Sequence, residues 1–298
     1  DSRMADKNNG GKLELWVTET HKDMVALGFK AKQTLFSGTS QYQQVDVIAT
    51  AGHGGMLLND GIVMVSERDE FVYHEMIAHV PLFSLAAPKS VLIIGGGDGG
   101  TAREVLRHRT IERVVMVEID EMVVDACKKH LPSMSGSLDD PRLELIIDDG
   151  VKFAEKCKES FDAVLIDSTD PIGPAQPLFD RTFYENVSHL LSDNGVMITQ
   201  SESPFYDPEI QHSMFSNQRP FFEKIHMYTF STLTYPGGLW SFGFASKGPC
   251  PIKDFDPERV KASKIETKYY NPAIHRAAFA LPEFVKKELA GLIDPAPL

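Results

Sequence analysis

The sequence is poor in cysteine and contains no long apolar run. Its three cysteines, Cys127, Cys157 and Cys250, lie far apart in a chain of 298 residues and include no C-x-x-C pair. This spacing argues against a disulfide framework and against a zinc site built on cysteine. No apolar run approaches the roughly 20 residues that span a bilayer, and the first dozen residues are polar, unlike a signal peptide. We therefore expect a cytoplasmic protein without a membrane partner.

Basic residues are outnumbered by acidic ones. The chain has 30 Lys and Arg against 42 Asp and Glu, which gives a formal net charge of −12. Proteins that bind nucleic acid need a basic face, so we expect no nucleic-acid partner. The acidic balance is compatible with cationic substrates, although many proteins of the cytoplasm are acidic for other reasons. The charge therefore excludes one class of function and does not select another.

The segment from residue 91 to residue 107 organises the rest of the chain. The apolar run 91–94 predicts a buried parallel strand, a glycine-rich turn follows, and residues 101–107 are predicted to be helical. A strand, a glycine loop and a helix in this order form the nucleotide end of a doubly wound sheet. Asp98 lies inside the turn, where its carboxylate would repel a pyrophosphate and attract a cation. The segment therefore predicts a cationic nucleoside ligand.

Three regions are expected along the chain. Residues 1–12 are predicted to be a disordered tail or a remnant of cloning. Residues 13–65 contain short alternating stretches separated by turn signals, which predicts a small antiparallel β-hairpin domain. Residues 66–298 alternate strands with helices, from a helix capped by Ser66 to a terminal helix at 282–289. They are predicted to be an α/β catalytic domain, with a Rossmann-like, doubly wound, mostly parallel sheet like that of S-adenosylmethionine methyltransferases.

Four consecutive predicted strands are each followed by an acidic residue. The strands are expected at 91–94, 114–117, 143–147 and 163–166, and the acids are Asp98, Glu118, Asp149 and Asp167. Each acid alone is more typical of a helix cap or a loop. Together they lie on one rim of the sheet, where ligands bind in open α/β folds. The 20 residues between Asp98 and Glu118 are typical of an acid that accepts hydrogen bonds from ribose hydroxyls, and Asp149-Gly150 suits an adenine amino group or a helix N-cap.

The carboxylates Asp167 and Asp170, three residues apart, suit a diamine. One ammonium can pair with each carboxylate, and aromatic rings can line the aliphatic stem between them. The candidate rings are Trp16, Tyr73 and Tyr235, and residues 170–174 are a candidate lid. An alternative is that Asp170 only caps a turn before Pro171.

The two histidines at 74 and 79 do not predict a metal site. They lack a third ligand and any H-E-x-x-H spacing, so we expect no metal. His79 is predicted to be structural, and His74 is a candidate to face the ligand.

Several motifs together resemble the polyamine aminopropyltransferase family, and within it the members that form spermidine. The resemblance runs from about Leu13 to Leu289 and is carried by LLNDGI at 57–62, ERDEFVYHEM at 67–76, LIIGGGDGG at 92–100, VEID at 117–120, DSTDPIGP at 167–174, TYPGG at 234–238, KYYN at 268–271 and HRAAFALP at 275–282. One departure is Met64, at a position where many relatives have glutamine. Any polar contact expected there is therefore in doubt.

The resemblance implies a reaction and an assembly. Decarboxylated S-adenosylmethionine, a co-substrate, would give its aminopropyl group to putrescine, which yields spermidine and 5′-methylthioadenosine without a metal or a separate cofactor. The family also implies a homodimer or a homotetramer. The resemblance places Gln33, Asp98, Glu118, Asp149, Gly150 and His74 on the donor side, and Trp16, Tyr73, Asp167, Asp170, Gln200 and Tyr235 on the acceptor side.

The chemistry of this reaction explains why it requires these residue types. An alkyl amine has a pKa near that of lysine, about 10.4, and must lose a proton before it attacks. We assign the role of base to Asp167, aided by Tyr73. The decarboxylated donor lacks the carboxylate of S-adenosylmethionine, so Asp98 would attract the former and repel the latter.

Four other functions are compatible with parts of the sequence. The nearest is an aminopropyltransferase for cadaverine, agmatine or a longer amine, which the sequence does not distinguish. A methyltransferase on the same fold is disfavoured by Asp98 and by the acid pair Asp167 and Asp170. A non-catalytic polyamine-binding protein is disfavoured because it needs affinity for the amine but no proton acceptor beside Tyr73. An NAD-dependent dehydrogenase is disfavoured because Asp98 obstructs the pyrophosphate.

Overall fold

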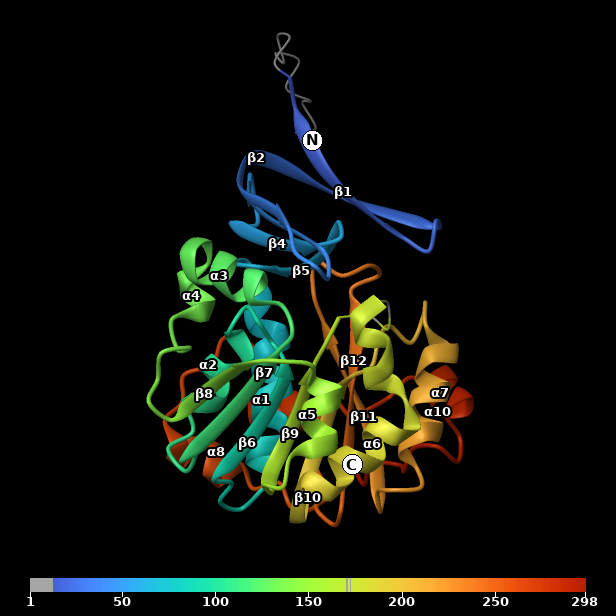
Figure 1. Ribbon diagram of the computed structural model, residues 1–298. Helices are drawn as coiled ribbons and strands as arrows, with labels where there is room; N and C mark the ends of the chain where they lie inside the picture. Colours follow the sequence, from blue (N-terminus) through green and yellow to red (C-terminus); the bar gives the residue numbers. More distant parts are fainter. Residues whose placement is uncertain (1–12, 170, 172) are drawn as a thin grey trace.

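Two β-sheets organise the computed structural model of the chain, which describes residues 13–169, 171 and 173–298 (Figure 1). The predicted tail at 1–12 and the predicted acceptor ligand Asp170 lie outside the described residues. Within the described ranges, no helix combines the length and the apolar character that a bilayer crossing requires.

The first sheet is antiparallel and its strands follow the chain order. It consists of β1 (Leu15–His21), β2 (Val25–Thr39), β3 (Gln44–Thr50), β4 (Gly55–Asn59) and β5 (Ile62–Ser66). Val45, Val47 and Leu57 pack against helices α3 (Glu121–His130) and α4 (Pro132–Ser135) of the second part of the chain. The β1–β2 hairpin is the part of this sheet farthest from the second sheet in Figure 1. The first sheet therefore covers one end of the second.

The second sheet has the strand order β11-β12-β10-β9-β6-β7-β8. The five strands from β10 to β8 are parallel, and β12 is antiparallel to both of its neighbours. The strands are β6 (Ser90–Gly95), β7 (Arg113–Glu118), β8 (Leu143–Ile147), β9 (Phe161–Asp167), β10 (Leu191–Gln200), β11 (Lys224–Ser231) and β12 (Leu239–Ser246). The predicted α/β fold class, with a Rossmann-like, mostly parallel sheet, is confirmed.

Helices cover both faces of this sheet, which explains its almost uninterrupted apolar strands. Val91 and Ile93 of β6 pack in one core with α1 and α2, whereas Leu92 and Ile94 pack in the opposite core with α6 and α7. The helices are α1 (Glu70–Ser84), α2 (Gly100–Leu106), α3 (Glu121–His130), α4 (Pro132–Ser135), α5 (Gly150–Lys156), α6 (Arg181–Leu190), α7 (Pro208–Gln218), α8 (Pro257–Ser263), α9 (Pro272–Ala277) and α10 (Glu283–Glu288), with a 3₁₀ helix at Gly173–Phe179.

The start of α1 differs from the prediction. Ser66 is the last residue of β5, and Asp69 is the residue that precedes the helix. Ser66 is nevertheless close to the helix start, because its hydroxyl donates to Asp69 Oδ1 at 2.7 Å. The helices α8 and α9 were not predicted, since each is a short helix in a mostly polar stretch with little apolar periodicity.

Candidate active site

The site lies where the order of the parallel strands changes direction. The chain moves from β6 to β7 on one side and later places β9 on the other side of β6, so a crevice opens between β6 and β9 at their carboxyl ends. The glycine loop is packed directly against the end of β9. Gly95 and Gly96 have φ values of 84° and 75°. The Gly96 N–H donates to the carbonyl of Asp167 at 3.0 Å, and a Cβ at Gly95 would lie 2.1 Å from that carbonyl oxygen. Only glycine fits there.

A cavity of about 280 Å³ occupies this crevice and is lined by residues from both sheets. It brings together eight of the residues predicted from the sequence: Tyr73, Asp98, Glu118, Asp149, Gly150, Asp167, Gln200 and Tyr235. These residues come from different helices, strands and loops. The acids that end consecutive strands therefore do meet at one site.

Glu118, which the sequence predicts as a ribose ligand, lines the cavity. Its side chain is buried and accepts hydrogen bonds from the backbone N–H groups of Gly97, at 3.1 Å, and Asp120, at 2.9 Å. Burial raises the pKa of Glu118 to about 7, against the opposing effect of the hydrogen bond from Asp120. This carboxyl group therefore titrates near neutral pH.

Asp149 is confirmed as a helix N-cap, and its predicted contact with an adenine amino group stays a prediction. It lines the cavity and also caps α5, because its Oδ1 accepts from Val151 N at 2.9 Å and Lys152 N at 3.4 Å. The next residue, Gly150, allows close packing, since a Cβ there would lie 2.5 Å from Ile94.

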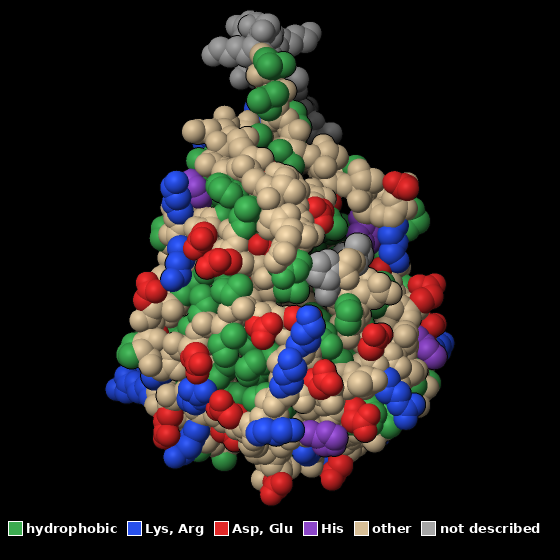
Figure 2. Space-filling view, viewed as in Figure 1, with side chains coloured by type: hydrophobic (Ala, Val, Ile, Leu, Met, Phe, Trp, Pro, Cys, Tyr) green, Lys and Arg blue, Asp and Glu red, His purple; other side chains and the backbone are tan. Residues whose placement is uncertain are grey.

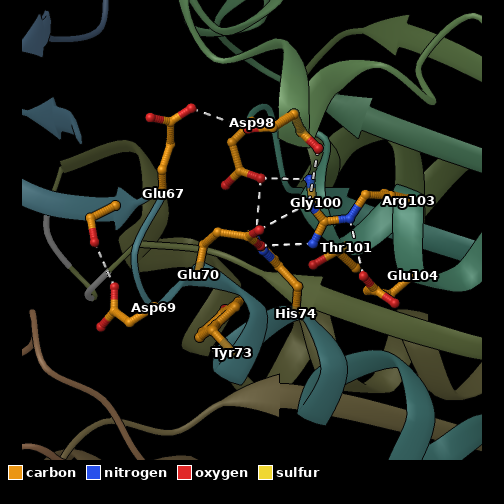
Figure 3. A network of polar contacts seen from close by, with 12 residues as sticks. Glu67, Asp69, Glu70, Tyr73, His74, Asp98, Gly100, Thr101, Arg103 and Glu104 are labelled. Carbon is orange, nitrogen blue, oxygen red and sulfur yellow. Dashed lines mark hydrogen bonds and ion pairs between the residues drawn. The ribbon is translucent and has the colours of Figure 1, made fainter. Parts of the chain in front are cut away.

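Asp98 lines the cavity and is held from behind by His74 (Figure 3). Asp98 Oδ1 accepts from Gly100 N at 2.7 Å and forms an ion pair with His74 Nε2 at 3.2 Å. On the other side of the ring, His74 Nδ1 donates to Glu70 Oε2 at 2.5 Å. Burial acts to lower the pKa of His74, but Asp98 and Glu70 outweigh it and raise the pKa to about 10. His74 is therefore an imidazolium between two carboxylates, behind the cavity wall.

Gly100 is required by the position of this imidazole. A Cβ at Gly100 would lie 2.1–2.5 Å from the ring atoms of His74. We expect Gly100→Ala to displace the ring and to lower the free energy of unfolding by about 1–3 kcal/mol. Urea denaturation would measure this change. The control is Gly52→Ala, where the nearest heavy atom is 3.9 Å away; equal stabilities of the two variants would contradict the expectation.

Each carboxylate oxygen of Asp167 accepts a hydrogen bond from a hydroxyl group. Tyr73 Oη donates to Oδ1 at 2.7 Å, and Thr101 Oγ1 donates to Oδ2 at 2.6 Å. Burial and the negative charge of Asp98 raise the pKa of Asp167, while His74 and the two hydroxyl groups act in the opposite direction. Burial and the negative charge of the Asp167 carboxylate raise the pKa of Tyr73 well above its usual value. Tyr73 therefore stays a phenol and donates this hydrogen bond. Thr101 was not predicted as a site residue.

Aromatic rings form a wall next to Asp167. The ring of Tyr235 packs edge-on against Tyr73, with centroids 6.2 Å apart, and lies 5.0 Å from the ring of Trp240. The hydroxyl of Tyr235 donates to the carbonyl of Met64 at 2.7 Å, so this ring is fixed to the first sheet. Gln200 lines the same cavity and hydrogen-bonds the buried Glu202.

Two predicted residues are not brought to the site. Gln33 is exposed on β2, and Trp16 is 56% exposed on the edge strand β1. Neither lines the cavity, because the first sheet reaches it through β4, β5, the loop before β3 and Glu19 of β1. The structure therefore does not bring these two residues to the cavity.

The lining residues that were not predicted include Gln43, Trp240 and Glu19. Gln43 donates to Asp120 Oδ2 at 3.0 Å, and the buried Glu19 accepts from Val63 N at 2.8 Å. The alternating pattern of β1 could have indicated that Glu19 points inward. It is the first residue of this strand that is fully buried. Nothing in the local sequence distinguishes Gln43 from Gln33.

The histidine that was predicted to be structural lies away from the cavity. His79 is buried, with Nε2 3.0 Å from Glu104 and Nδ1 2.9 Å from His108. Over the described ranges of the chain, no group of three or more His, Cys, Asp or Glu side chains is arranged to hold a metal ion. Acidic and basic side chains are interspersed on the face shown in Figure 2.

Comparisons with known proteins give a consistent result over nearly the whole chain. A family described as "Spermine/spermidine synthase domain" matches residues 70–256, and one described as "Spermidine synthase tetramerisation domain" matches residues 15–67. A polyamine aminopropyltransferase of Thermoanaerobacter sp. (strain X514) is 47% identical over 277 residues, which cover 92% of this chain and 98% of that protein. A relative of the same name from Alkaliphilus metalliredigens (strain QYMF) is 44% identical over 279 residues, 93% of this chain and 98% of that protein.

Solved structures agree. Spermidine synthase from Thermotoga maritima matches with a TM-score of 0.90 and 44% identity, over 93% of this chain and 95% of that one. A spermidine synthase solved in complex with the transition-state analogue AdoDATO matches with a TM-score of 0.90 and 45% identity, over 92% of this chain and 94% of that one.

Proposed function

The chain belongs to the spermine/spermidine synthase family of polyamine aminopropyltransferases, and on that premise we propose that it transfers an aminopropyl group from decarboxylated S-adenosylmethionine to putrescine. The products are spermidine and 5′-methylthioadenosine. Proteins of this family are transferases of polyamine biosynthesis, and the chain is an enzyme of that class. The observation that carries the proposal is the arrangement of Asp167, Tyr73 and Asp98 around one cavity.

The donor occupies the half of the cavity next to β7 and α5. Glu118 accepts hydrogen bonds from the ribose hydroxyls, and Asp149 with Gly150 binds the adenine amino group. Asp98 pairs with the ammonium at the end of the aminopropyl chain, with His74 behind it. The co-substrate brings its own leaving group, so the proposal needs no separate cofactor.

Asp167 acts as the base for the amine. The amine loses a proton to this carboxylate, directly or through a water, and its lone pair attacks the methylene carbon bound to the sulfonium. The new C–N bond forms as the C–S bond breaks, and the bonding electrons stay on sulfur as a neutral thioether. The raised pKa of Asp167 makes it a better proton acceptor than an ordinary aspartate. Holding the two substrates in line supplies much of the rate.

The acceptor lies along the aromatic wall. Tyr73, Tyr235 and Trp240 line the aliphatic stem of putrescine, and Gln200 adds a polar contact. The proposed partner for the far ammonium, Asp170, lies outside the described residues. The buried carboxylate of Glu19 is a further candidate on the same cavity wall.

The assembly we propose is a homo-oligomer, a dimer or a tetramer, held through the first sheet. Two observations support it: the match of residues 15–67 to a tetramerisation domain, and the exposed apolar side chains Leu15, Trp16 and Met24 on the β1–β2 hairpin. The cytoplasmic localisation and the absence of nucleic-acid and membrane partners stay predictions.

One incubation tests the reaction. The protein is mixed with decarboxylated S-adenosylmethionine and with putrescine, cadaverine, agmatine or spermidine, and the products are identified by mass spectrometry. We expect 5′-methylthioadenosine and, with putrescine, spermidine. Absence of 5′-methylthioadenosine with every amine would contradict the assignment, and faster turnover of another amine would correct the acceptor.

The pKa of Glu118 predicts a pH-dependent affinity for the nucleoside. A carboxylate accepts hydrogen bonds more strongly than a carboxylic acid, and Glu118 ionises as the pH rises through its pKa of about 7. We expect the affinity for 5′-methylthioadenosine to rise by up to about tenfold between pH 6 and pH 8. Titration calorimetry would measure it. Glu118→Gln should abolish the pH dependence, whereas Glu121→Gln, on an exposed neighbour, should keep it.

A further inference from the structure

Two adjacent acids at the start of α1 hold opposite halves of the site, although neither lines the cavity. We propose that Asp69 is a positioning residue for the amine half and that Glu70 is a positioning residue for the donor half. The proposal rests on the proposed function, because it assigns each acid to one of the two substrates. Figure 3 shows Glu70 next to His74, and Asp69 apart from them at the start of the helix.

Asp69 fixes the loop that carries Tyr235. Its Oδ2 accepts hydrogen bonds from the hydroxyl groups of Thr232, at 2.5 Å, and Thr234, at 3.0 Å, and from the backbone N–H groups of residues 233 and 234. The carboxylate is buried, and its other oxygen accepts from Ser66. One carboxylate oxygen thus accepts four hydrogen bonds from the turn that joins β11 to β12.

The turn that Asp69 holds leads directly into the acceptor wall. Tyr235 follows Thr234, and Pro236 and Trp240 line the cavity as well. Trp240 Nε1 donates to the Pro236 carbonyl at 3.0 Å, so the ring and the turn move together. Asp69 therefore determines the position of the aromatic wall relative to Tyr73 and Asp167, although it does not contact the amine.

Glu70 acts in the other direction, toward the donor. Arg103 of α2 donates to both of its oxygens, at 3.0 and 2.8 Å, and Glu70 Oε2 in turn accepts from His74. The bidentate pair fixes the carboxylate in one orientation. His74 then presents its other nitrogen to Asp98, whose carboxylate lines the donor half.

The charged groups around His74 are few and come from three elements. They are Glu70 of α1, Asp98 of the glycine loop, and Asp167 at the end of β9, whose pKa His74 helps to lower. The ring also packs edge-on against Tyr73 and flat against Gly100. Within this set Glu70 is the carboxylate that is backed by an arginine, and it keeps the imidazolium protonated and aimed at Asp98.

The test uses Glu70→Gln and Asp69→Ala, each as the control for the other, in steady-state assays with both substrates varied. For Asp69→Ala we expect the KM for putrescine to rise about tenfold and the KM for the donor to stay within about twofold. Asp69→Asn keeps one oxygen acceptor and should recover most of the loss. For Glu70→Gln we expect the reverse split, with the donor KM raised about tenfold.

A pH profile separates positioning from a general structural role. In the wild type, His74 stays protonated up to its pKa of about 10. In Glu70→Gln its pKa falls, so kcat/KM for the donor, taken as a ratio to the wild-type value at each pH, should fall as the pH rises from about 6 to 9. Thermal unfolding would confirm that both variants fold.

The outcomes distinguish this inference from the proposed function. An active wild type whose variants raise both KM values equally, or whose ratio of Glu70→Gln to wild-type kcat/KM is flat or rises with pH, would overturn the positioning roles alone. A wild type that forms no 5′-methylthioadenosine would overturn the proposed function, and the inference with it.

Discussion

Replacing Asp167 with asparagine is expected to lower kcat by about 1,000-fold while both KM values change by less than about threefold. Asparagine keeps the shape of the side chain, and its amide oxygen can still accept one of the two hydroxyl hydrogens that Asp167 now holds. It cannot take a proton from the amine. The loss therefore falls on the chemical step, in which a protonated amine with a pKa of about 10.4 must become a nucleophile.

Steady-state kinetics with putrescine and the decarboxylated donor would measure this effect. The matched control is Asp193→Asn, the same chemical change at an exposed position on β10. A reduction of only a few-fold in the Asp167 variant would show that another group, or solvent, takes the proton.

Replacing Asp98 with asparagine is expected to lower kcat/KM for the decarboxylated donor by about 100-fold and to weaken the rejection of S-adenosylmethionine. The buried His74 imidazolium would lose one of its two carboxylates. The ammonium of the donor would lose its counterion, and the carboxylate of S-adenosylmethionine would no longer meet a like charge. Both changes act on the choice of donor.

Competition experiments with the two nucleosides would measure the discrimination, again with Asp193→Asn as the control. Equal preference in the wild type and the Asp98 variant would contradict the explanation. A second readout is the acid limb of the pH profile. Asp98 is one cause of the raised pKa of Asp167, so its neutralisation should lower that pKa and move the limb to lower pH.

Much of the fold and of the donor half follows from local patterns. The apolar run 91–94 and the glycines after it predict a buried strand and a turn because few other structures suit such a sequence. The acids Asp98, Glu118, Asp149 and Asp167 could be placed together because the carboxyl ends of parallel strands share one edge. The α/β fold class followed from the same alternation.

The contribution of the first sheet could not be predicted in this way. Which of its residues reach the cavity depends on how that sheet packs on α3 and α4, and no local pattern records such a contact. From the sequence alone, Gln33 and Gln43 are equally plausible ligands, and Trp16 is as plausible a residue of the aromatic wall as Trp240. The buried positioning contacts of Asp69 and Arg103 were missed for the same reason, because both join segments that are distant in sequence.

The contact between Gly96 and Asp167 fixes two parts of the active site relative to each other. The glycine loop and the end of β9 are joined through the backbone, by a hydrogen bond and by a packing distance that leaves no room for a side chain. The loop that carries Asp98 and the strand that carries Asp167 are therefore joined directly through the main chain. The spacing between the two carboxylates, and with it the spacing of the substrates they are proposed to hold, is set by the main chain and not by side-chain packing.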